Sequence, residues 1–508
     1  MRSKLALRNT LISMGSIFVS IIIGLVVPRY ILSYYGSEVN GLVSSINQFL
    51  NYITILESGV GAVVVTCMYK PFAEKDYKKI NQIVSKSRKF FLGIVGVYLV
   101  YVVILAILYP FVTATSFEHI YVSMMVFVLG ITLFVQYCFT INYSLILQAA
   151  QRYYVASLTS MILQMINAIV SIVLIIMHVD ILFVKLVSSL IFVINPLILS
   201  IYVKKMIPGI SFTEKSDFVI PQKKDTLVHN LTYVIHNNTD MVMITLFLGV
   251  KMVSIYSVYN MVISSLRRLM ESFSSGTQAA FGDMIARDQY DNLKQSFYRF
   301  EYLVQIIATV IFTVTAVMLV PFVLLYTKGV TDISYNVPLF SYVMVLAEAI
   351  YIFRLPYHTL IKASASFKAT RNSAVIEAGL NIFITVVLIN IIGLPGAAFG
   401  TLVAMLYRTI YYISFFKTRY ININVEKTIF RIGFNVLLSV GICLLFGGFV
   451  VQHCHSVISW LLYSALVSIL TTIIVCLGNL IVFKAEIVSV LQYAMQKIRK
   501  NKMKEDAL

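Results

Sequence analysis

Charged side chains lie in the middle of segments that are otherwise apolar. The clearest case is the adjacent pair Arg267 and Arg268, which Glu271 follows one helical turn later. Guanidinium groups bind phosphate oxygens through paired N–H groups, and a carboxylate three or four residues along a helix neutralises part of their charge. Two bases with one acid leave a net positive charge, so this pattern favours an anion-binding site. The alternative is a structural ion pair, with Asp240 as a second counter-charge.

Other polar side chains fall in comparable positions, most of them in the first two apolar segments of each half of the chain. A charge at the bilayer centre costs about 2.5–3.5 kcal/mol on the insertion scale, so such residues are expected to face a partner or a watery cavity. We therefore expect one substrate-binding set: Arg267, Arg268, Arg29, Asn47, Asn51, Glu57, Asn260, Glu271, Asp240 and Arg354. Arg29 could instead extend to a membrane interface, and Glu57 and Asp240 could have structural roles.

The composition explains why these charges are unusual. Of 508 residues, 59% are hydrophobic and 12% are charged, and the mean hydropathy is +0.86. Soluble domains carry about 25% charged residues because their surface meets water. The chain is therefore expected to be an all-α polytopic membrane protein.

About 20 mostly apolar residues are needed to cross a bilayer as a helix. This criterion predicts about 14 transmembrane helices, near 9–33, 41–68, 91–112, 120–147, 154–177, 181–203, 229–249, 253–281, 302–326, 337–361, 372–392, 396–416, 430–451 and 457–483.

The positions of lysine and arginine test this map, because cytoplasmic loops retain these residues. With the N-terminus inside, 32 of the 40 bases fall in inner segments, and the outer loops hold only Lys251 and Lys328. The split alternates along the whole chain, so one missed or invented helix would destroy it. We expect a multi-pass membrane protein with both termini in the cytoplasm.

A weak internal repeat occurs at an offset of 213 residues, where Gly36 pairs with Gly249 and Tyr77 with Tyr290. It predicts two pseudo-symmetric six-helix lobes with a substrate site between them. The expected organisation is an N-lobe over 1–205, a cytoplasmic linker over 206–228, a C-lobe over 229–417, an extra helix pair over 418–484 and a basic cytoplasmic tail over 485–508.

Several functional classes are disfavoured by what the sequence lacks. It has no phosphate-binding loop with its lysine, and its five cysteines show no paired spacing, so we expect no cofactor, no metal site and no disulfide framework. The net charge of +18 is explained by the inner loops, so no nucleic-acid partner is expected. The loops are also short for a membrane-embedded enzyme, which favours a transporter.

Short motifs in the chain resemble those of the polysaccharide repeat-unit flippases of bacteria, which belong to the multidrug/oligosaccharidyl-lipid/polysaccharide exporter superfamily. The motifs are LRNT at 7–10, GLVVPRY at 24–30, GSEVNGL at 36–42, ESGVG at 57–61 and LQAAQR at 147–152. The resemblance implies a V-shaped two-lobe fold that works by alternating access. The implied substrate is an undecaprenyl-pyrophosphate-linked oligosaccharide for capsule, O-antigen or exopolysaccharide. Membrane lipids, a polysaccharide polymerase and the chain-length machinery are the implied partners.

Two other transport functions remain open from the sequence, and an envelope scaffold is a third, disfavoured alternative. The appended helix pair also resembles that of lipid II flippases, although the first two spans hold no base other than Arg29. A cation-coupled small-molecule exporter is the other alternative, with Glu57 or Asp240 as its coupling site.

Overall fold

The computed structural model describes residues 2–57, 59–214, 218, 238–272, 274–417, 419–484 and 486–487. All regular elements among these residues are helices, as the sequence predicts. In a bilayer, a helix satisfies each backbone N–H and C=O group within its own segment, so long apolar segments fold in this way. Most of the predicted linker 206–228, the first part of the predicted span 229–249 and nearly all of the predicted tail 485–508 lie outside the described residues.

The chain divides into two compact units, which are described separately. Unit 1 comprises Met1–Ser257 and Gly329–Ile333, and unit 2 comprises Val258–Lys328 and Ser334–Leu508.

Unit 1 contains the first nine labelled helices, a π-helix and a short helix over Asn238–Leu248. The labelled elements are α1 (Arg2–Asn51), α2 (Thr54–Glu57), α3 (Val60–Glu74), α4 (Tyr77–Val112), α5 (His119–Val135), η1 (Gln136–Thr140), α6 (Ile141–Ala149), α7 (Tyr153–Ile176), α8 (Ile181–Ile191) and α9 (Ile194–Met206). The first turns of α11 (Val250–Ser272) also belong to this unit.

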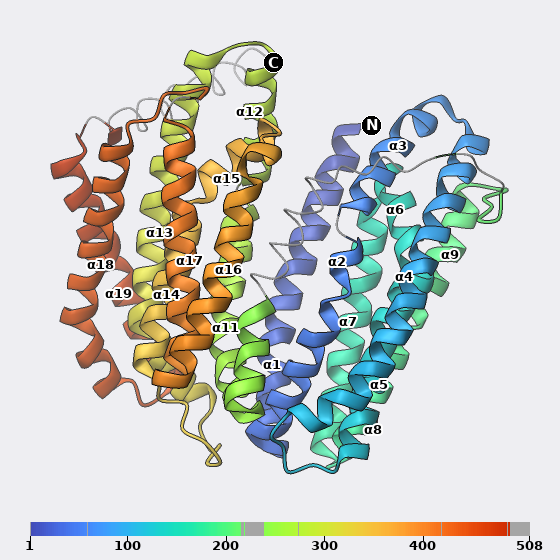
Figure 1. Ribbon diagram of the computed structural model, residues 1–508, viewed down its shortest axis with the longest axis horizontal. Coiled ribbons are helices and arrows are strands. Elements are labelled where there is room, and N and C mark those ends of the chain that lie inside the picture. The colour runs from blue at the N-terminus through green and yellow to red at the C-terminus, as the bar shows by residue number, and fades with distance from the viewer. Residues whose placement is uncertain are drawn as a thin grey trace. The chain divides into compact units, whose positions relative to one another are not determined.

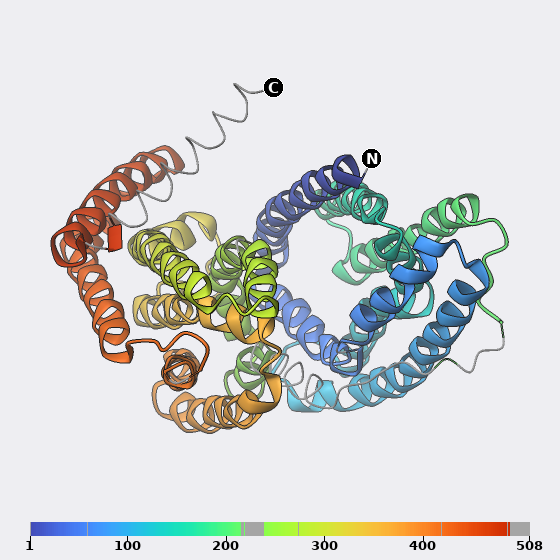
Figure 2. The same ribbon diagram turned by 90° about the horizontal axis from the view of Figure 1, so that it is seen from above.

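Unit 2 contains the rest of α11 and the helices that follow it. These are α12 (Ser274–Ala286), α13 (Tyr290–Tyr326), α14 (Pro338–Phe353), α15 (Leu355–Ala363), α16 (Phe367–Ile392), α17 (Leu394–Phe415), α18 (Val425–His453) and α19 (Val457–Val482). Within this unit α13 packs against α14, α18 and α19, and α17 packs against α14 and α16. Figure 2 shows the red pair α18–α19 beside the yellow α13, at one side of the unit.

Ten helices in the described ranges are long and apolar enough to cross a membrane. They cover or overlap eleven of the fourteen predicted spans, because the 50-residue helix Arg8–Glu57 includes both 9–33 and the start of 41–68. The other three predicted spans hold more polar or shorter helices, namely Asn238–Leu248, α11 with α12, and α17. The predicted helix count is therefore roughly consistent with the structure.

The predicted span 41–68 is interrupted rather than continuous. Helix α1 ends at Asn51, and α3 begins after Gly59, which has a left-handed backbone with φ 82°. Glycine adopts this conformation without the steric cost that a side chain imposes. The break places Glu57 at the end of the short helix α2.

The internal repeat is confirmed by the backbone. Residues with left-handed φ recur in pairs 213 to 215 positions apart, namely Gly36 with Gly249, Lys75 with Asp288, Gln151 with Ala365, and His178 with Gly393. Helices α6 and α15 both have nine residues and begin 214 positions apart. Left-handed residues are uncommon outside glycine, so four matched pairs at nearly the same offset are strong evidence that the units share one helix plan.

Candidate functional site: a charge cluster in unit 2

A buried ion pair joins α11 to α14. Arg267 donates from Nε to Oε1 of Glu348 at 2.7 Å and from Nη2 to the other carboxylate oxygen. The Glu348 side chain is 5% exposed and that of Arg267 is 18% exposed. The pairing is bidentate, which is the strongest geometry for a guanidinium and a carboxylate. Glu348 is therefore a full counter-charge to Arg267, a role that the sequence suggested for Glu271 or Asp240.

Tyr351, one turn after Glu348, connects this pair to its neighbours. Its hydroxyl donates to Oε1 of Glu271 at 2.6 Å. The guanidinium groups of Arg267 and Arg354 lie 5.1 and 4.9 Å from its ring centre, within cation–π distance. The tyrosine thus brings together three of the predicted residues on α11 and α14–α15.

Arg354 lies where α14 gives way to α15, two residues before Pro356. Proline has no N–H group to continue the backbone ladder, so a helix break is expected there. Arg354 Nη1 donates to Glu377 Oε1 on α16 at 2.5 Å, and Arg408 Nη1 on α17 lies 3.4 Å from Glu377 Oε2. Glu377 therefore holds two arginines, one on each carboxylate oxygen.

Three arginines and three glutamates face one another in this cluster, namely Arg267, Arg354 and Arg408 with Glu271, Glu348 and Glu377. Lys362 of α15 also interacts electrostatically with Glu271. Arg268 lies outside the ion pairs: its side chain is exposed, and within the described residues its hydrogen-bond partner is the hydroxyl of Ser265 at 3.4 Å. Of the two adjacent arginines, Arg268 is thus the one available to an anion.

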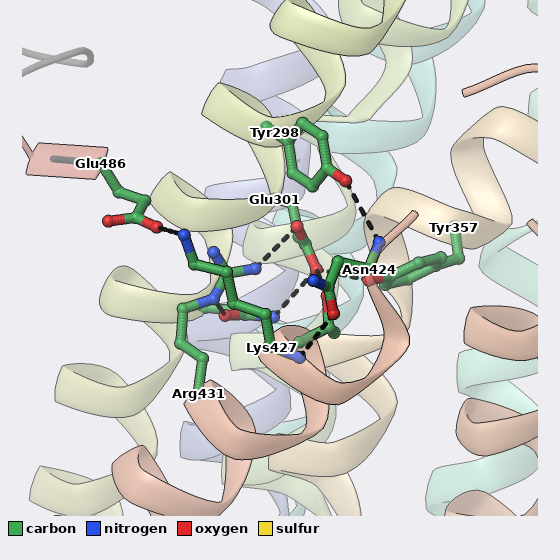
Figure 3. A network of polar contacts seen from close by, with 9 residues as sticks. Tyr298, Glu301, Tyr357, Asn424, Lys427, Arg431 and Glu486 are labelled. Atoms are coloured by element: carbon green, nitrogen blue, oxygen red, sulfur yellow. Dashed lines mark hydrogen bonds and ion pairs between the residues drawn. The ribbon is translucent and has the colours of Figure 1, made fainter. Parts of the chain in front are cut away.

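Figure 3 shows a second buried network, which joins α18 to α13 and α15. Arg431 Nη2 lies 2.6 Å from Glu301 Oε2, and its Nε donates to Gln305. Tyr357 and Thr428 donate to Glu301 Oε1, the latter at 3.4 Å. Glu301 has no exposed surface and Arg431 is 2% exposed. The network fixes the first appended helix, α18, to the rest of unit 2 through Arg431, which was not among the predicted site residues.

Beside this network, an apolar cavity of about 320 Å³ lies between α13, α14 and α18. Its wall includes Phe312, Val345, Ala349 and Leu444, with the hydroxyl groups of threonine and serine residues at a few positions. The residues of the ion-pair network precede the cavity lining on α13 and α18 by about one helical turn. The cavity therefore has apolar walls and a polar, electrically neutral end.

The other predicted residues lie in unit 1, except Asn260 of α11, which is half-buried in unit 2. In unit 1, Glu57 accepts a hydrogen bond from Tyr137, and Asp240 is buried with Tyr256 Oη 3.5 Å from its Oδ2. Arg29 is half-buried, and Asn47 and Asn51 are exposed on α1. His236 and Asn237, which precede Asp240, are outside the described residues.

Sequence reasoning missed Glu348, Tyr351 and Glu377. A signal was present, since Glu348 is the one acidic residue of α14 and Glu377 the one acidic residue of α16. An acid inside an apolar helix is as costly as a base and needs a partner equally.

Comparisons with known proteins agree with this architecture. Residues 226–387 match the model of the MatE family, and a search of curated protein sequences gives no match. The structure of "Lipid II flippase MurJ, inward closed conformation" is similar with a TM-score of 0.67 and 15% identity, over 94% of this chain and 100% of that chain. The structure of an inward-facing multidrug resistance MATE family transporter of the MOP superfamily is similar with a TM-score of 0.59 and 12% identity, over 82% of this chain and 99% of that chain. The structure of a MOP superfamily transporter from Pyrococcus furiosus Vc1 is similar with a TM-score of 0.54 and 11% identity, over 82% of this chain and 96% of that chain.

Together, these matches show that the chain shares its fold with the proteins named, and the MatE family model matches residues 226–387 of it. The titles of these structures describe a flippase and transporters.

Proposed function

We propose that the protein is a flippase that moves undecaprenyl-pyrophosphate-linked oligosaccharide repeat units across the bacterial cytoplasmic membrane by alternating access. In this proposal both termini are cytoplasmic, and the repeat units supply capsule, O-antigen or exopolysaccharide synthesis. The observation that carries the proposal is the apolar cavity of unit 2, which is lined in part by the appended helix α18. A cavity with apolar walls suits a polyprenyl chain, since burial of apolar surface is favourable in proportion to its area.

The comparisons support a lipid substrate in a specific way. The flippase structure matches 94% of the chain and the multidrug transporter 82%. The difference is about the length of the pair α18–α19, and α18 of this pair provides one wall of the cavity.

The head group would be bound by Arg268, since Arg267 is already neutralised by Glu348. Asn47, Asn51 and Asn260 would hydrogen-bond sugar hydroxyl groups. Delivery of repeat units to a polymerase and the chain-length machinery follows from the same proposal.

The test uses cells that make the polymer and depend on this protein. Arg268→Gln should accumulate lipid-linked repeat units at the inner leaflet and reduce polymer, because the pyrophosphate loses its cation. The matched control is Arg287→Gln, which removes an exposed arginine of unit 2 that pairs with Asp283 at 2.9 Å, and it should leave the polymer near the wild-type level. Normal polymer in Arg268→Gln would contradict the role of this residue.

A second variant tests the cavity. Ala349→Trp places an indole in the cavity wall and should block the polyprenyl chain while Arg268 remains intact. Purified protein can then be titrated with undecaprenyl pyrophosphate in nanodiscs, with the fluorescence of the single tryptophan of the wild type, Trp460, as the signal. For the variant, binding is followed by native mass spectrometry. Equal binding by both proteins would contradict the cavity as the lipid site.

Two alternative functions have support of their own. The similarity to the MurJ structure favours a lipid II flippase, and the MatE match over 226–387 favours a cation-coupled small-molecule exporter. Depletion of the protein distinguishes a lipid II flippase from a repeat-unit flippase, because the lipid that accumulates differs in its sugar content. An exporter should instead confer drug resistance when it is expressed.

A further inference from the structure

Two sequence motifs that the proposed function leaves unused meet in unit 1. They are LRNT, near the start of α1, and LQAAQR, at the end of α6. Asn9 of the first motif donates from Nδ2 to the carbonyl of Gln151 in the second motif at 2.9 Å. The Oδ1 of the same asparagine accepts from the backbone N–H of Tyr154 at 2.8 Å. The first turns of α1 are thereby joined to the turn between α6 and α7.

Each motif also contributes an arginine to this place. The guanidinium group of Arg8 lies 4.3 Å from the ring centre of Tyr154, within cation–π distance. Arg152 donates from Nη1 to the hydroxyl oxygen of Tyr202 on α9 at 3.3 Å. The hydroxyl groups of Tyr154 and Tyr202 are hydrogen-bonded to each other. The two arginines therefore contact neutral aromatic side chains, and these contacts leave their positive charges unbalanced.

The neighbouring segments contribute two more bases, whereas the nearby acids already have partners. Lys204 and Lys205 are exposed in the last turn of α9. On α3, Glu74 pairs with Lys70 at 3.7 Å, and Asp76 beyond its end accepts from a backbone N–H group of α4 at 2.9 Å. Within the described part of the chain, no acid forms an ion pair with the two arginines or the two lysines of this place.

A pocket of about 570 Å³ opens beside these bases. Helix α6 packs against α3 and α9, and the pocket lies where these three helices end (Figure 1). Its wall includes Arg152, Gln151 and Tyr77, together with the apolar side chains of Phe72 and Met206. A wall that combines a guanidinium group and polar side chains with apolar surface suits an amphipathic molecule that carries negative charge.

The corresponding place in unit 2 is filled. Tyr290 and Tyr420 stand at the positions of two pocket residues, at offsets of 213 and 214, and their ring centres lie 6.4 Å apart. The next residue, Ile421, is buried in an apolar cluster with Phe297 and Phe416. Ser366 stands at the position of Arg152. The open pocket and its arginine are therefore features of unit 1 and do not belong to the helix plan that the repeats share.

An exposed apolar face of α9 leads toward this pocket. The residues on this face are 41% to 69% exposed, namely Ile194, Leu197, Ile198 and Ile201. Their spacing of three, four and seven residues places them on one side of the helix, and Lys205 follows Ile201 by four positions on the same side. In a membrane helix, such a face contacts acyl chains. A lipid along α9 would thus have its chains on apolar side chains and its head group at the bases.

We propose that the pocket binds the head group of an anionic phospholipid of the inner leaflet. Arg8, Arg152 and the two lysines supply the positive charge, and guanidinium groups match the oxygen atoms of a phosphate diester. Basic pockets between transmembrane helices on the cytoplasmic side bind phospholipid head groups in this way. The apolar face of α9 favours a lipid over a soluble phosphate compound. The site is separate from Arg268 and from the cavity of unit 2, so the proposal does not depend on the transported substrate.

Native mass spectrometry of the full-length protein tests the proposal, after release from nanodiscs that contain equal amounts of phosphatidylglycerol and phosphatidylcholine. The measurement involves no transport substrate, so its result is independent of the proposed flippase function. The wild type should retain phosphatidylglycerol in preference to phosphatidylcholine. Arg152→Ser, which introduces the residue of unit 2, should lower this preference about fivefold, the contribution of one base near an anionic lipid. Arg287→Gln, which removes an exposed arginine of unit 2, should leave it unchanged. An equal preference in Arg152→Ser and the wild type would overturn the proposal.

Two further variants separate the pocket from its charge. Met206→Tyr introduces the residue that fills the corresponding place in unit 2, and it should reduce retention of phosphatidylglycerol although every charge remains. Arg152→Lys keeps the charge and should retain most of the preference. An unchanged preference in Met206→Tyr would overturn the pocket as the site, and these two variants decide the question if Arg152→Ser does not fold. Displacement of the lipid by an equal concentration of soluble glycerol 3-phosphate would overturn the choice of a phospholipid.

Discussion

The ion pair between Glu301 and Arg431 allows a quantitative prediction about the attachment of the appended helices (Figure 3). Glu301→Gln keeps the size of the side chain and an oxygen that can accept from Tyr357, but it removes the negative charge. Arg431, which is 2% exposed, then becomes a buried charge without its acid. Breaking a buried pair in this way costs about 3–5 kcal/mol. We expect the upper half of that range because Glu301 has no exposed surface.

Removing both charges should cost less than removing one. In Glu301→Leu/Arg431→Leu, no charge is left unpaired, and replacement of a buried pair by apolar residues is often near neutral. The hydroxyl of Tyr357 then loses its acceptor, which adds about 1–3 kcal/mol. Adding Tyr357→Phe should therefore return the protein to within about 1 kcal/mol of the wild type. We therefore expect the triple variant to be the most stable of the three, the double variant to be less stable, and Glu301→Gln to be the least stable.

The assay is reversible unfolding by sodium dodecyl sulfate in mixed micelles, followed by the fluorescence of Trp460. This side chain reports on α19 because its indole N–H donates to the carbonyl of Met318 on α13 at 3.2 Å. A cost below about 1 kcal/mol for Glu301→Gln would refute the reasoning, because it would mean that water screens the pair as it does on a surface.

Three further substitutions test the packing and the backbone. Gly400→Val should strongly destabilise the protein in thermal unfolding, because a Cβ atom there would lie 2.1 Å from the Thr385 hydroxyl and 2.8 Å from its backbone nitrogen. Asn479→Leu removes a 2.9 Å hydrogen bond to Asn435 between α18 and α19, and should cost about 1 kcal/mol in the same micelle titration. Gln151→Gly should raise the melting temperature, because Gln151 has φ 60°, a conformation that costs a side-chain-bearing residue about 1 kcal/mol or more. An unchanged melting temperature for this variant would show that the turn tolerates glutamine.

Most of the fold follows from local properties of the sequence. The length of an apolar segment identifies a membrane helix without reference to any other segment. Both ends of α7 and α19 and the C-terminal end of α16 therefore fall within one residue of the predicted positions, whereas α16 begins five residues before its predicted start. The interruptions within helices were harder to predict from the sequence. The interruption after Asn51 is marked by Gly59 alone, and the π-helix at 136–140 has no proline or glycine to mark it.

The partners of the charged residues depend on contacts between distant segments. Glu348 is 81 residues from Arg267, and Glu377 is 23 residues from Arg354. The spacing rule for helices suggested Glu271 because it considers only neighbours within one helix. Counting acids as well as bases within apolar spans would have identified both glutamates, although not their pairing.

The repeat gives these non-local contacts a common origin. Both units place a glutamate at the second membrane segment and a tyrosine 80 residues later, so this pair belongs to the shared helix plan rather than to either unit alone. Unit 2 adds guanidinium groups around its copy, whereas unit 1 has isoleucine and threonine at the matching positions.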